Sequence, residues 1–149
     1  SLSMMQDDPD IKEMYLDKAF DIIIPFDTLG VANIDSVAMS EIYTLKAMIY
    51  VGKIFINPMV NGMKYGPMSD KSINKAISYC PTNPRPYYLN GQSKFYTPSA
   101  FGGGMDKAIP LLKKSLDNYE IFETKKYWPN WGKSKCQSLY NEAINNVEK

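Results

Sequence analysis

The segment from Ala76 to Gly91 limits the possible fold of this chain more than any other. Its residues are typical of the end of one helix, a tight turn and the start of the next helix. Pro81 cannot continue a helix, whereas Asn83 and Pro84 supply a cap and a first turn. The small residues at the two ends of the segment allow close approach of neighbouring helix axes. The segment therefore predicts a boundary between packed helix pairs, which favours binding over catalysis.

Helical periodicity in the rest of the chain predicts about six helices and no strand. We expect the helices at 9–24, 36–56, 69–79, 84–96, 105–122 and from about 130 to 147. Glycine, asparagine and proline within 60–68 and 101–104 predict loops there, and Pro25 is expected to end the first helix. Residues 1–7 are interpreted as a loose terminus, and 28–36 as a connector. The prediction is one all-α domain over residues 1–149, in which antiparallel helix pairs form an α-α superhelix.

Composition narrows the possible functions. The net charge of +1 gives no basic field for nucleic acid, and no apolar run is long enough to cross a membrane. The chain has no histidine, which removes the commonest general base and transition-metal ligand. We therefore predict no metal, no cofactor and no enzymatic activity. Cys80 and Cys136 can form one disulfide or remain buried thiols.

We call the segment from Ala76 to Gly91 the joint. The pattern around the joint resembles tetratricopeptide repeats, which consist of paired helices. The end of one repeat matches Ala76 to Pro81, and the resemblance covers about residues 38–143. Two apparent insertions, at 58–68 and 98–104, depart from the family pattern. The residues that match the repeats elsewhere are Tyr43, Ala47, Tyr50, Tyr87, Gly91, Ala108, Leu112, Ser115, Trp131, Cys136 and Leu139.

A narrower resemblance concerns residues 96–104, Ala108 and 129–132. These segments are similar to a group of uncharacterised exported bacterial repeat proteins. That resemblance implies a location in the cell envelope or periplasm. Otherwise the chain is expected in the cytoplasm.

The repeat resemblance also implies a binding groove, because the first helices of successive pairs line a concave surface in that family. A protein or peptide is the expected partner, with Arg85 and Lys133 binding a carboxylate and amide side chains bonding an extended backbone. Tyr88, Phe95 and Tyr140 can instead serve only to pack helices together. The implied groove residues are Arg85, Tyr88, Gln92, Phe95, Tyr96, Lys133, Gln137, Tyr140 and Asn141, with Glu41, Thr44 and Met48 on an earlier helix.

Two readings of function follow. The first is a non-enzymatic helical-repeat scaffold that binds a protein or peptide in its groove. The alternative is a small-molecule-binding protein or accessory subunit of a cell-envelope system, in which a helical cup encloses an apolar ligand. A closed apolar cavity would favour the alternative, and an open polar groove would favour the scaffold.

Overall fold

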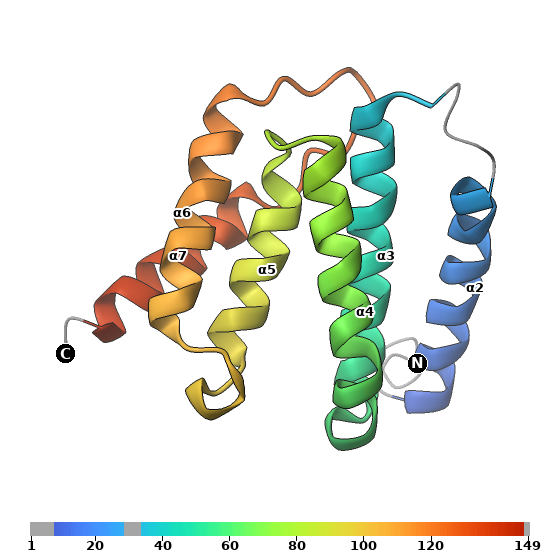
Figure 1. Ribbon diagram of the computed structural model, residues 1–149, viewed down its shortest axis with the longest axis horizontal. Helices are drawn as coiled ribbons and strands as arrows, with labels where there is room; N and C mark the ends of the chain where they lie inside the picture. Colours follow the sequence, from blue (N-terminus) through green and yellow to red (C-terminus); the bar gives the residue numbers. More distant parts are fainter. Residues whose placement is uncertain (1–7, 29–33, 148–149) are drawn as a thin grey trace.

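The computed structural model describes residues 8–28 and 34–147, which form six α-helices and one short 3-10 helix (Figure 1). The described residues contain no β-strand, so the all-α prediction is confirmed. The predicted loose terminus and residues 29–33 of the predicted connector lie outside the described residues. The elements are α2 (Pro9–Thr28), α3 (Ser36–Ile56), α4 (Pro58–Tyr79), α5 (Pro84–Tyr96), η2 (Ser99–Phe101), α6 (Met105–Ile121) and α7 (Lys133–Val147).

The helices form two antiparallel pairs with one further helix at each side (Figure 1). Helix α3 packs along α4, and α5 packs along α6. Helix α7 lies against α6, while α2 lies against α3. The pairs are joined through contacts of α5 with both α3 and α4. As a result, α2 has one principal neighbour, whereas the central helices are covered on several sides.

The joint identified in the sequence has the expected local structure. The Asn83 side chain accepts a hydrogen bond from the Arg85 backbone N–H at 3.0 Å, which caps α5. Leu112 of α6 is fully buried, and a Cβ atom at Gly91 would lie 2.7 Å from two of its side-chain carbons. Only glycine at this position allows α5 and α6 to approach so closely.

The main correction to the sequence prediction concerns residues 58–68. They form the first turns of α4, although 60–68 were predicted as a loop and 58–68 as an insertion. Contacts with α3 outweigh the poor helix propensity of this segment. Asn61 donates a side-chain hydrogen bond to the Lys53 carbonyl oxygen at 2.7 Å, and the Tyr65 ring stacks on Tyr50 at 5.9 Å.

Other helix boundaries differ by less. Helix α2 continues through Pro25 to Thr28, because proline in a last turn removes one backbone donor while keeping a helical φ. Helix α7 begins at Lys133, a little later than predicted, because Gly132 has φ +107° and cannot belong to the helix. Helix α6 ends at Ile121, one residue earlier than the predicted end at Phe122.

Candidate functional site

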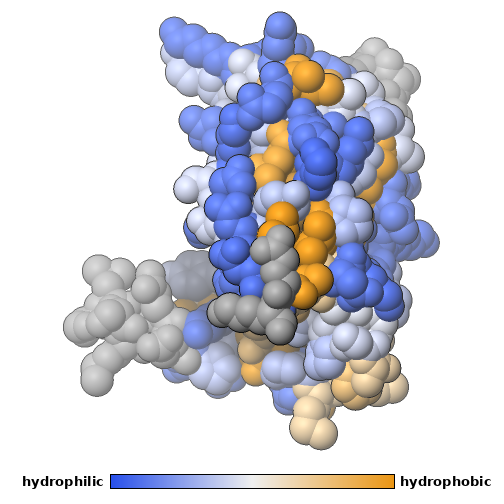
Figure 2. Space-filling model, turned by 90° about the vertical axis from the view of Figure 1, so that its left-hand side faces the viewer, coloured by the Kyte–Doolittle hydropathy of each residue, from blue (hydrophilic) through white to orange (hydrophobic). Residues whose placement is uncertain are grey.

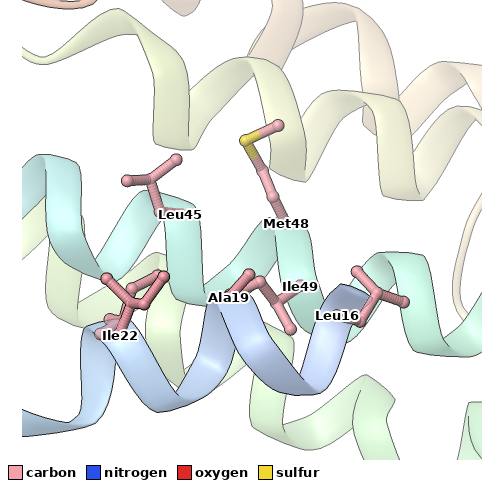
Figure 3. A pocket seen from close by; sticks show the side chains of 7 residues that line it. Leu16, Ala19, Ile22, Leu45, Met48 and Ile49 are labelled. Atoms are coloured by element: carbon pink, nitrogen blue, oxygen red, sulfur yellow. The ribbon is translucent and has the colours of Figure 1, made fainter. Parts of the chain in front are cut away.

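An open apolar pocket of about 430 Å³ lies where α2 meets α3. Figure 3 shows Ala19 and Ile49 close together between the two helices, while Leu45 and Met48 extend from α3 away from α2. All the lining side chains are apolar. They are Leu16, Ala19, Ile22, Ile23, Leu45, Met48 and Ile49.

Small residues let α2 approach α3 closely at one end of this pocket. Leu16 of α2 sits against Gly52 of α3, where an added Cβ atom would lie 2.8 Å from a Leu16 methyl carbon. Larger side chains stand at the rim. Ile22 is 69% exposed, Leu45 40% and Met48 38%, which is high for apolar residues. Apolar surface of this kind marks a contact that the described residues do not provide.

The apolar surface continues along α2. Tyr15, Ala19, Ile22 and Phe26 are spaced by four, three and four residues, so they share one side of the helix. Tyr15 and Phe26 are both exposed. The Lys18 ammonium lies 5.9 Å from the centre of the Tyr15 ring, which places a cation beside this apolar strip. Ala19 and Ile22 therefore belong both to the pocket and to this apolar strip, which has the Lys18 ammonium beside it.

Arg85 lies away from solvent, in a buried ion pair. It is 1% exposed and donates to Glu41 Oε1 at 2.8 Å and to the Pro129 carbonyl oxygen. Its guanidinium also lies 5.6 Å from the Trp131 ring centre. Burial raises the pKa of Glu41, against the opposing effects of Arg85 and Asn83. The structure thus differs from the groove prediction, since the carboxylate that Arg85 binds belongs to the chain itself and joins α3 to α5.

Three more predicted groove residues are also buried. Glu41 and Thr44 lie inside the packing of α3, where the Thr44 hydroxyl donates to the Ser40 carbonyl oxygen at 2.7 Å. Tyr88 is 5% exposed and packs edge-on against Trp131, as the packing interpretation predicted. Its hydroxyl accepts a hydrogen bond from Gln92 at 3.2 Å.

The remaining predicted residues differ in burial and in their partners within the chain. Phe95 and Tyr140 pack against the core, whereas Tyr96 is exposed. Lys133 pairs with Glu120 at 2.7 Å, and Gln137 bonds Asn141 at 2.9 Å. Figure 2 shows the side of the molecule where α6 and α7 lie, with a narrow apolar strip between hydrophilic side chains. Met48 is the predicted groove residue that lines the apolar pocket.

Sequence reasoning missed the rest of the pocket because it used the apolar residues of the first helix only to predict the helix itself. A usable signal was present in α2. Its apolar residues extend around more of the helix than one neighbour can cover, and Met14, Tyr15, Ile22 and Ile24 are all exposed. An unusually wide apolar surface on a helix with one principal neighbour therefore indicates a second contact.

The chemistry of the pocket is that of an apolar binding surface. Within the described ranges, no cluster of three or more histidine, cysteine, aspartate or glutamate residues is placed to hold a metal ion. Cys80 and Cys136 are free and buried, and burial raises the pKa of the Cys136 thiol. Neither thiol is therefore presented to a ligand. The pocket offers apolar contact and the Met48 thioether, which suit a small apolar molecule.

Comparison with known proteins gives one informative match. No family model and no curated protein matches the sequence, so the tetratricopeptide resemblance is not confirmed. Among solved structures, the HusA haemophore from Porphyromonas gingivalis is similar, with a TM-score of 0.80 and 30% sequence identity. The match covers 95% of this chain and 68% of that chain.

Proposed function

Because the chain belongs to the family of the HusA haemophore, we propose that it binds haem or a related porphyrin as a carrier. The open apolar pocket between α2 and α3 is the observation that carries this proposal. It has the apolar lining expected for the small-molecule alternative of the sequence analysis, although it is open where a closed cavity was expected. The family likeness favours that alternative over a peptide-binding scaffold, since the related protein is a haemophore.

The chemistry of the pocket fits a porphyrin. Haem has two wide apolar faces and carries two carboxylates at one edge. Ile22, Leu45 and Met48 present apolar surface at the rim, and the pocket volume of about 430 Å³ is within the usual range for small-molecule sites. Lys18 lies one helical turn before Ile22, which lines the pocket, and we propose that its ammonium pairs with one of these carboxylates.

We expect iron ligation to contribute little to the affinity. Histidine is absent from the sequence and both cysteines are buried, and among the side chains that line the pocket only the Met48 thioether is of a kind that binds haem iron. Most of the affinity is therefore expected from burial of apolar surface. An iron-free porphyrin should bind with an affinity close to that of haem.

A charge placed in the pocket should weaken binding. In a titration of ferric haem followed by its Soret absorbance, Met48→Asp is expected to raise the Kd at least about tenfold, because bound porphyrin would desolvate the carboxylate. Met68→Asp is the matched control, since Met68 is 44% exposed and lies outside the pocket. Equal affinities of the two variants would place the porphyrin elsewhere.

A second variant separates apolar contact from iron ligation. Met48→Leu keeps the volume and removes the sulfur, so haem and iron-free protoporphyrin should both keep their affinities within about threefold. A large loss for haem alone would mean that the Met48 thioether ligates iron and would contradict the apolar account.

We also propose that the helix pairs form a superhelix of the tetratricopeptide type, as one domain over residues 1–149. The pairs α3–α4 and α5–α6 support this, together with the contacts that link α3, α5 and α7. Gln92, Tyr96, Lys133, Gln137 and Asn141 retain their predicted role as contacts for a protein partner. That role would concern a second surface, away from the porphyrin pocket.

A further inference from the structure

A cluster of exposed apolar side chains lies where α3 turns into α4. It consists of Phe55, Met59, Val60 and Met63, which we call the tip, and Met59 and Met63 are 89% and 87% exposed. None of the four lines the porphyrin pocket. Phe101 of η2 is 81% exposed and lies at the same end of the molecule, on the connection from α5 to α6 (Figure 1).

The start of α4 does not require this apolar surface. Asn57 caps the helix and Pro58 occupies its first position, so these two residues stabilise the helix start without the apolar side chains that follow. Met59, Val60 and Met63 follow at a spacing that places them around one side of the first two turns. Figure 2, whose lower edge is the same end of the molecule, shows apolar side chains protruding there. Such a patch on a convex end marks a contact surface.

The charge around the tip indicates what kind of surface it meets. Lys64 is the one charged residue between positions 54 and 69, and positions 95–105 contain none. The Lys64 ammonium lies 4.9 Å from the centre of the Tyr65 ring, a pairing that suits the boundary between apolar and polar layers. Asp8 and Asp10 begin α2 at this same end, so the end has no strong positive charge (Figure 1). The tip therefore suits contact with an apolar layer that lies beneath polar groups without net charge.

We propose that the tip and Phe101 insert shallowly into the surface of a lipid bilayer. A stable protein interface needs a continuous complementary patch of about 800 Å² on each partner. The tip and Phe101 instead lie on two separate protruding connections. A fluid lipid layer can adapt its shape to both of them. Flexible methionine side chains adapt to such an environment. No helix of the described segments is long and apolar enough to span a membrane, so the contact is proposed for the surface alone.

Sedimentation with lipid vesicles tests the proposal without any porphyrin. Wild type is expected to bind vesicles of phosphatidylcholine, with or without added phosphatidylglycerol, and to stay bound in high salt. The double variant Met59→Ser/Met63→Ser should lower the partition coefficient at least about tenfold, because two apolar side chains lose their burial. The haem affinity of this variant should equal that of wild type, which keeps the test independent of the pocket.

The control is Ile121→Ser/Val147→Ser, which removes two exposed apolar side chains outside the tip. It should bind vesicles as wild type does. The proposal is overturned if wild type does not bind phosphatidylcholine vesicles, if binding needs phosphatidylglycerol and disappears in salt, or if the tip variant binds as well as wild type. Capture of a specific protein that depends on Met59 and Met63, without vesicle binding, would likewise overturn it in favour of a protein interface.

Discussion

Replacing Arg85 with alanine is expected to lower the free energy of unfolding by about 3–5 kcal/mol, because it leaves the buried carboxylate of Glu41 without its charged partner. The Arg85–Glu41 pair is almost completely buried, with side-chain exposures of 1% and 8%. The substitution also removes the hydrogen bond to the Pro129 carbonyl oxygen and the contact with Trp131. Chemical denaturation followed by circular dichroism measures the loss.

The pH dependence of this loss follows from Glu41. Burial already raises its pKa, and removing Arg85 removes an effect that lowers it. A raised pKa means that the folded state holds the proton more tightly than the unfolded state does. The instability therefore appears as pH rises above the unfolded pKa and is relieved in acid. The loss should be smaller at about pH 4 than at about pH 7.

Two controls accompany Arg85→Ala. Lys113→Ala breaks an exposed pair with Asp117 and should leave the free energy of unfolding almost unchanged. The double variant Glu41→Leu/Arg85→Met replaces both charges and should cost less than Arg85→Ala alone. A loss below about 1 kcal/mol for Arg85→Ala would contradict the buried pair as the link between α3 and α5.

Gly91→Val is expected to lower the free energy of unfolding by about 2–3 kcal/mol, through overpacking between α5 and α6. Even the first added carbon would lie 2.7 Å from two side-chain carbons of Leu112, and 3.2 Å from its backbone nitrogen. Leu112 is fully buried, so it has little room to move. Thermal unfolding gives the comparison with wild type.

Gly62 is the matched control, because it too lies inside a helix but a Cβ atom there meets nothing within 4 Å. Gly62→Ala should raise the free energy of unfolding by about 0.5–1 kcal/mol through better helix propensity. If Gly91→Val were as well tolerated as Gly62→Ala, the close approach of α5 and α6 would not be needed.

The helices and the joint could be predicted from the sequence because their signals are local. Asn83, Pro84 and Gly91 act through capping, a fixed φ and a missing side chain, and each has the predicted effect on the structure. The start of α4 could not be predicted in this way. Gly62, Gly66 and Pro67 all disfavour a helix locally, and the contacts that outweigh them come from α3.

The candidate site was harder to predict than the fold. Arg85 has the residue type of a ligand-binding group, but its partner Glu41 lies 44 positions away in sequence and is brought to it by folding. The pocket depends on the exposure of Ile22, which no second helix of residues 8–28 and 34–147 covers, and a residue pattern alone does not show such exposure. Met48 was predicted as a groove residue together with Glu41 and Thr44, but it lines the pocket against α2, whereas the other two are buried.

Methyl NMR with ferric haem tests the central claim most directly. Paramagnetic iron broadens the signals of nearby methyl groups, so the methyl signals of Ile22, Leu45 and Ile49 should broaden, together with that of Met48. Those of Ile121 and Val147, on other helices, should remain sharp. Iron-free protoporphyrin should shift the same signals without broadening them. Broadening centred on α6 or α7, or no change at the pocket methyl groups, would contradict the proposed site.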